Sequence, residues 1–123
     1  MICEISKKCG GCQFINQDYQ KSLEYKNSYM KALFKDFHVA IHPIIGMHNP
    51  YGYRNKVIVA FNKNYEYGLY QGHSHHIVPY SYCLLHDELT DSIIHKIALL
   101  LKKYRVPIYD PRTCKGEIRH VLI

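Results

Sequence analysis

The stretch Val57-Ile58-Val59-Ala60-Phe61-Asn62-Lys63-Asn64-Tyr65-Glu66-Tyr67-Gly68-Leu69-Tyr70 decides the architecture of this chain. Two segments rich in β-branched and aromatic residues flank a short polar turn, which is typical of a β-hairpin. Further short strands are expected at residues 76–79 and 118–123. Strands joined by such turns pair antiparallel, so the sequence predicts a mostly antiparallel sheet.

Two amphipathic helices are expected to cover this sheet. The first is predicted at residues 17–36 with Asn16 as its N-cap, and the second follows Asp87. One face of the first helix is expected to pack against the core. The residues of this face, spaced three and four apart, are Tyr19, Leu23, Lys26, Met30, Leu33 and Phe37. The second is expected to turn this face to the sheet: Ile93, Ile94, Ile97, Leu100, Leu101 and Tyr104.

The apolar segment 39–45, which contains Pro43, predicts an edge or bent strand at which the sheet begins. The fold class expected from all these elements is α+β, with a mostly antiparallel sheet, two covering helices and an N-terminal metal-cluster loop.

Composition limits the classes of function. A length of 123 residues suits one domain, and the 16 basic against 10 acidic residues give a net charge of +6 that favours an anionic partner such as nucleic acid. The longest apolar run, 93–101, is shorter than the roughly 20 residues of a membrane span. The N-terminus lacks the features of a signal peptide, so a cytoplasmic location is expected.

Three cysteines near the N-terminus predict a metal site. Cys3, Cys9 and Cys12 have the spacing C-x5-C-x2-C, and Cys83 is the candidate for a fourth ligand. An odd number of cysteines in a reducing compartment argues against a disulfide framework. Three thiolates in one loop and a distant fourth favour a [4Fe-4S] cluster, whose irons each take one thiolate.

Zinc remains open as the alternative metal, because Cys83-x2-His86 also has ligand spacing. Gly10 and Gly11 suit either metal, since a loop that wraps a metal is expected to use positive φ and to turn N–H groups toward sulfur. The remaining cysteine, Cys114, has no candidate base beside it and is not assigned a catalytic role.

A basic segment at residues 50–56 predicts contacts with phosphate. In an extended chain Arg54 and Lys56 share one face, and Arg54 can bind phosphate bidentately. No glycine-rich dinucleotide loop, P-loop or paired carboxylate motif is present, so the motifs predict a binding module without an active site of its own.

Five short motifs, in this order, resemble those of the S-adenosylmethionine-dependent RNA (uracil-5-)-methyltransferases. They are Cys3-x5-Cys9-Gly10-Gly11-Cys12-Gln13, Tyr19-x5-Tyr25-Lys26, Pro50-Tyr51-Gly52-Tyr53-Arg54-Asn55-Lys56, Tyr67-Gly68-Leu69-Tyr70 and Gly116-Glu117-Ile118-Arg119-His120-Val121. The resemblance covers nearly the whole chain. It implies methyl transfer from S-adenosylmethionine to C5 of a uridine, most closely as in the iron–sulfur enzymes that act on 23S ribosomal RNA.

The resemblance also implies roles for individual residues. The family's [4Fe-4S] ligands would correspond to Cys3, Cys9, Cys12 and Cys83. Contacts with the RNA partner, expected to be ribosomal RNA, would fall on Tyr53, Arg54, Lys56, Arg119 and His120.

The family's methyltransferase domain is not matched by these motifs. Residues 1–123 are therefore expected to form one iron–sulfur and central RNA-recognition domain, with the catalytic domain following residue 123. The chain alone would be inactive, and S-adenosylmethionine would bind only in the longer protein. The competing interpretation is a stand-alone zinc-binding nucleic-acid module without enzymatic activity.

Overall fold

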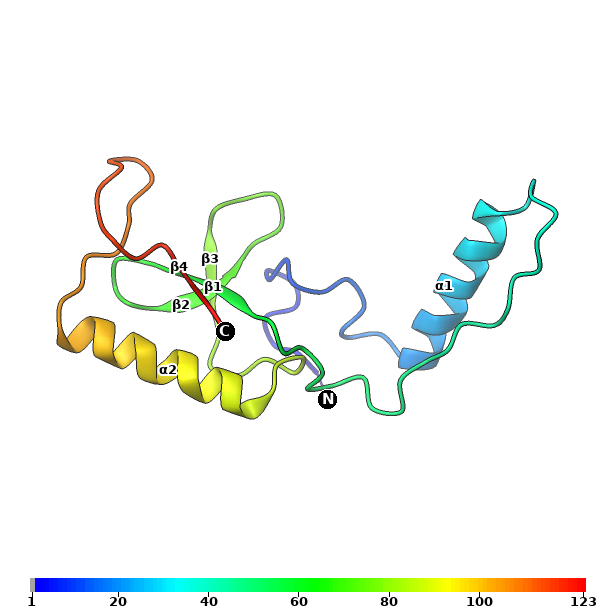
Figure 1. The fold of residues 1–123 in the computed structure, drawn as a ribbon, viewed down its shortest axis with the longest axis horizontal. Coiled ribbons are helices and arrows are strands. Elements are labelled where there is room, and N and C mark those ends of the chain that lie inside the picture. The colour runs from blue at the N-terminus through cyan, green and yellow to red at the C-terminus, as the bar shows by residue number, and fades with distance from the viewer. Residues whose placement is uncertain (1) are drawn as a thin grey trace.

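The computed structural model describes residues 2–123 and has the predicted α+β architecture (Figure 1). Its elements are α1 (Tyr19–Leu33), β1 (Ile58–Phe61), β2 (Tyr67–Tyr70), β3 (Ile77–Pro79), α2 (Glu88–Lys103) and β4 (His120–Leu122). The strands form one sheet in the order β3-β2-β1-β4, and every neighbouring pair is antiparallel.

The predicted hairpin lies at the centre of the sheet. Phe61 pairs with Tyr67, and the Oδ1 atom of Asn62 accepts hydrogen bonds from the backbone N–H groups of Asn64, at 2.9 Å, and Glu66, at 3.1 Å. The Asn62 side chain therefore holds the turn that the sequence predicted. Alternation along β1 sends Val59 and Phe61 into the core.

Helix α2 covers one face of the sheet (Figure 1). Its N-cap is Asp87, as predicted, whose side chain accepts a hydrogen bond from the backbone N–H of Leu89 at 2.7 Å. Ile94 is fully buried in the core cluster, but Leu100 and Tyr104 are exposed, which corrects the predicted apolar face. Leu100 lies roughly 120° around the helix from Ile94, outside the stripe that the sheet covers.

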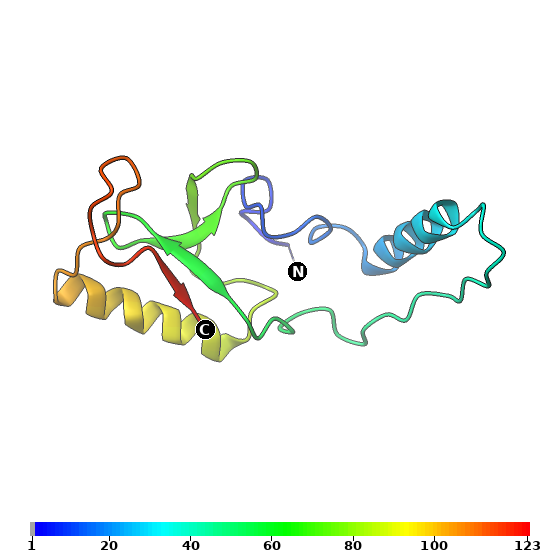
Figure 2. The same ribbon diagram turned by 45° about the horizontal axis from the view of Figure 1, so that its top comes forward.

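Helix α1 does not cover the sheet, so that prediction was wrong. Figures 1 and 2 show α1 standing away from the sheet, with the segment after it returning to β1. Ser22 is its buried residue, whereas Leu33 and Phe37 of the predicted core stripe are 56% and 62% exposed. A helical pattern marks an apolar face, but it does not tell which surface covers that face.

Two boundaries and one strand also differ from the prediction. Asp18, not Asn16, caps α1, because its Oδ1 atom accepts a hydrogen bond from Lys21 N at 3.0 Å. The segment 39–45 forms no strand, and Ile45 within it is 96% exposed. The edges of the sheet are β3 and β4, so the sheet does not begin at this segment.

The final strand is shorter than predicted, because Ile118 makes only an isolated parallel bridge with Ile108. Within residues 2–123, neither helix is long and apolar enough to cross a membrane.

Replacing Ile94 by alanine is expected to lower the free energy of unfolding by about 2–5 kcal/mol, since it opens a cavity between α2 and the sheet. Leu99→Ala on the same helix, at a side chain that is 55% exposed, is the matched control and should cost less than about 1 kcal/mol. Urea unfolding followed by circular dichroism measures both. Equal losses would show that α2 does not pack as described.

Candidate metal centre and adjoining cleft

The N-terminal cysteine loop is attached to the end of β2. Gly10 N donates a hydrogen bond to Tyr70 O at 3.0 Å, and Cys9 forms an isolated antiparallel bridge with Gln71. A Cβ atom on Gly10 would lie 2.9 Å from both Tyr70 O and Gly72 N. Glycine is therefore required here by the close approach of two backbones.

The predicted use of positive φ by the two loop glycines was wrong. The described glycines with positive φ are Gly52 and Gly116, not Gly10 or Gly11. The loop does turn an N–H group toward sulfur, because Gly11 N donates a hydrogen bond to Cys9 Sγ at 3.3 Å.

The four predicted ligands lie within electrostatic reach of one another. Burial raises the pKa of Cys9 against the lowering effect of the Gly11 N–H, and the thiols of Cys83 and Cys3 raise it further. Burial also raises the pKa of Cys12, which the same two thiols and Cys9 perturb in the same direction. All four side chains are half-buried, whereas Cys114 is exposed.

A buried hydrogen-bond network fixes the loop that carries Cys83. Asp91, in the first turn of α2, accepts hydrogen bonds from Cys83 N at 2.9 Å and from His86 Nδ1 at 2.8 Å. His86 is 1% exposed, and Tyr80 Oη lies 3.3 Å from the same Nδ1 atom. One carboxylate therefore holds both the backbone of a candidate ligand and the neighbouring imidazole.

The other His86 nitrogen, Nε2, is buried and has no hydrogen-bond partner of standard geometry. The His86 side chain nevertheless contacts Cys83. Burial alone would raise the pKa of Cys83, but this side chain and the backbone N–H of Leu85 lower it below its ordinary value. The environment of Cys83 thus favours a thiolate.

The structure does not show the predicted metal-cluster loop, which stays a prediction. Among residues 2–123, no group of three or more His, Cys, Asp or Glu side chains lies close enough together to hold a metal ion. A [4Fe-4S] cluster would need four thiolates spread around a cube, one for each iron. Half-buried thiols, N–H donors to Cys9 and Cys83, and a tightly docked glycine loop suit such a group.

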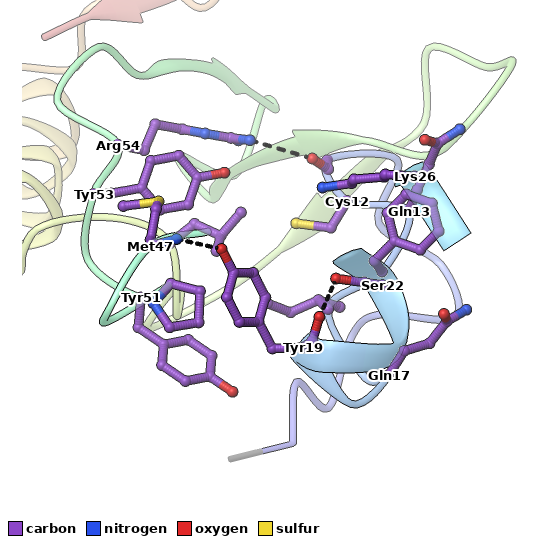
Figure 3. Close-up of a pocket in the computed structure, with 15 residues that line it drawn as sticks. Cys12, Gln13, Gln17, Tyr19, Ser22, Lys26, Met47, Tyr51, Tyr53 and Arg54 are labelled. Carbon is purple, nitrogen blue, oxygen red and sulfur yellow. Dashed lines mark hydrogen bonds between the residues drawn. The ribbon is translucent and has the colours of Figure 1, made fainter. Parts of the chain in front are cut away.

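A cleft of about 370 Å³ adjoins the cysteine loop (Figure 3). It lies between that loop, the first turns of α1 and the segment that precedes β1, and Cys12 is part of its lining. Tyr53 and Arg54, two of the predicted RNA contacts, line it as well. Lys56 is exposed and does not line this cleft.

Arg54 also supports the cysteine loop. Its Nη2 atom lies 3.4 Å from Gly11 O, and its charge lowers the pKa of Cys12 against the larger effect of burial. Its backbone N donates a hydrogen bond to Leu85 O at 2.8 Å, next to the Cys83 loop. Arg54 thus links the two segments that carry the cysteines.

The other two predicted RNA contacts lie on a different part of the molecule. His120 Nε2, on β4, is 3.0 Å from Tyr70 Oη, and the Arg119 guanidinium lies over the Tyr109 ring at 5.4 Å from its centre. Burial and the charge of Arg119 lower the pKa of His120. Neither residue lines the cleft.

Sequence reasoning missed the role of Asp91. The signal available was an acidic residue one turn before Ile94, on the apolar side of a helix, where a carboxylate needs buried partners.

Asp91→Ala is expected to lower the free energy of unfolding by about 2 kcal/mol or more, because the buried His86 ring and the half-buried N–H of Cys83 both lose their acceptor, and an unpaired buried donor costs about 1–3 kcal/mol. Asp110→Ala is the matched control, since Asp110 pairs with the exposed Arg112 at 3.0 Å and its loss should change stability little. Urea unfolding monitored by tyrosine fluorescence compares the two. A small effect at position 91 would contradict the buried network.

Comparison with known proteins places the chain among longer proteins. No family model matches it. It is 36% identical over 127 residues to a protein of Clostridium tetani named uncharacterized RNA methyltransferase, covering 98% of this chain and 28% of that protein. A protein of the same description from Listeria monocytogenes serotype 4b is 38% identical over 126 residues, with the same coverage.

A solved structure shares the fold. It is the crystal structure of Pyrococcus abyssi tRNA (uracil-54, C5)-methyltransferase in complex with S-adenosyl-L-homocysteine, with a TM-score of 0.74 and 21% identity over 94% of this chain and 27% of that chain. The chain spans just over a quarter of the length of the curated relatives it matches. The predicted resemblance is confirmed: over 98% of its length, this chain is homologous to a segment of proteins named RNA methyltransferases.

Proposed function

We propose that residues 1–123 are the iron–sulfur and RNA-recognition part of an RNA 5-methyluridine methyltransferase that acts on ribosomal RNA. The observation that supports this proposal is the homology of the chain to proteins named RNA methyltransferases, in a chain whose four predicted ligands are half-buried and perturb the pKa of Cys9 and Cys12. The chemistry, with S-adenosylmethionine as methyl donor, would belong to the part of the longer protein that this chain does not span.

The cluster would act as a structural link. Cys3, Cys9, Cys12 and Cys83 would each bind one iron of a [4Fe-4S] group, which supplies strong bonds between segments far apart in sequence. The attachment of Gly10 to β2 and of Cys83 to Asp91 would hold the two cysteine-bearing segments ready for the metal.

The basic residues would hold the RNA. Arg54 can bind phosphate with donors that its contact with Gly11 leaves free, and Tyr53, 49% exposed, offers a ring on which a base can stack. Lys56 would add a phosphate contact next to them. Arg119 and His120 would make a second contact at β4.

A zinc-binding nucleic-acid module is the second candidate, and the buried Nε2 atom of His86 favours it. Asp91 holds the opposite nitrogen, Nδ1, and a carboxylate in that position is usual for a histidine that binds metal. In such a module His86 and Cys83 would be ligands together, and the chain would have no enzymatic role.

Cys83→Ser is expected to abolish most iron binding and the visible absorbance of the anaerobically purified protein, because it removes one ligand of the cluster. Cys114→Ser is the matched control and should retain both, since Cys114 is exposed and is not one of the predicted ligands. Iron content and absorbance spectra are measured for the two variants. Equal iron in both would refute Cys83 as a ligand.

Replacing both Arg54 and Lys56 by alanine is expected to weaken RNA binding and to reduce the slope of log K against log salt by about 1.4, or about 0.7 for each lost phosphate contact. The control is the double replacement of Lys102 and Lys103, two exposed residues at the end of α2. Metal content is measured alongside, because Arg54 also contacts Gly11. An unchanged slope would show that these side chains are only a solvated basic surface.

A further inference from the structure

The cleft beside Cys12 combines segments that are far apart in sequence. The cysteine loop contributes Gln13, one side of α1 contributes Tyr19 and Lys26, and the segment before β1 contributes Tyr51. Figure 3 shows these side chains around a common space. None of these four residues was among the predicted RNA contacts or metal ligands.

Hydrogen bonds hold the walls of this cleft in place. Tyr19 Oη accepts a hydrogen bond from Met47 N at 2.7 Å, which ties α1 to the returning segment (Figure 3). On the opposite wall Arg54 contacts Gly11 O at 3.4 Å. Ser22, buried at the base of α1, donates to Tyr19 O at 2.7 Å. These hydrogen bonds hold the segments that line the cleft against one another, so the cleft is part of the folded structure.

The lining is aromatic and cationic. Lys26 lies with its Nζ atom 5.3 Å from the centre of the Phe14 ring, and Arg54 retains donors beyond its single contact. None of the described residues that line the cleft is acidic. Tyr51 is half-buried and Tyr53 is 49% exposed, so a ligand in the cleft can contact both rings. Such a lining favours an anionic ligand that also has a flat apolar face.

The size of the cleft limits this ligand. A volume of about 370 Å³ is near the lower end of small-molecule sites, which span roughly 300–1,000 Å³. A base inside a duplex has both faces covered by its neighbours, so only an unpaired base can offer a face to tyrosine. Gln13 and Gln17 add amide groups that can both donate to and accept from the edge of a base.

We propose that this cleft binds one unstacked nucleotide of single-stranded RNA, with its base against Tyr51 and Tyr53 and its phosphate between Lys26 and Arg54. The inference rests on the proposed function, because it names a subsite within the same RNA-binding surface. The nucleotide would lie next to Cys12, so the conformation of the cysteine loop would set the shape of the subsite.

The test compares two RNA probes on the 123-residue chain: a short single-stranded RNA and the same strand annealed to its complement. The wild-type chain should bind the single strand more tightly. Tyr51→Leu should weaken that binding about 10-fold and remove the preference, because the base loses a stacking surface. Tyr104→Leu, at a tyrosine that is 68% exposed at the end of α2, is the matched control and should behave as wild type.

A second pair of variants tests the phosphate contact. Lys26→Gln and Lys35→Gln each remove one positive charge from or just after α1, but only Lys26 lines the cleft. Lys26→Gln should lower affinity for the single strand severalfold more than Lys35→Gln does. Circular dichroism of all four variants establishes that each is folded.

The outcomes separate the two proposals. If the wild-type chain binds neither probe, the proposed RNA-binding function fails. If it binds RNA but shows no preference for the single strand, or if Tyr51→Leu and Lys26→Gln match their controls, the nucleotide subsite is wrong while RNA binding stands.

Discussion

The hydrogen bond from Gly10 N to Tyr70 O is the contact on which the arrangement of the candidate site depends. Together with the bridge between Cys9 and Gln71, it attaches the N-terminal loop to the end of β2. That attachment brings the early cysteines toward the Cys83 loop and forms one wall of the cleft. A side chain at position 10 would force the two backbones apart, and the cysteine loop and the cleft beside it would both lose their shape.

The central part of the fold could be predicted because its signals are local. The hairpin at β1 and β2 follows from two β-rich segments around a polar turn, and α2 follows from Asp87 and the apolar face that follows it. The placement of α1 could not be predicted in the same way. Its apolar stripe repeats at helical spacing, but that spacing is the same whether the stripe meets this sheet or another surface.

The candidate site, like the fold, could be predicted only in part from the sequence. Cysteine spacing predicted Cys3, Cys9, Cys12 and Cys83 as ligands, and this assignment stays a prediction, although the thiols of Cys3 and Cys83 raise the pKa of Cys9 and of Cys12. The partners of those ligands were not predictable from spacing. Asp91 acts through two hydrogen bonds that exist only when α2 packs beside the Cys83 loop, and Arg54 contacts Gly11 across 43 positions of sequence. The cleft likewise exists only in the folded chain.

The central claim is that four cysteines hold one [4Fe-4S] cluster that joins the N-terminal loop to the core. The most direct measurement is the content of iron, acid-labile sulfide and zinc in chain purified without oxygen. The account predicts about four irons and four sulfides per chain and negligible zinc. One zinc per chain, with no iron or sulfide, would contradict it and would support the module in which His86 binds the metal.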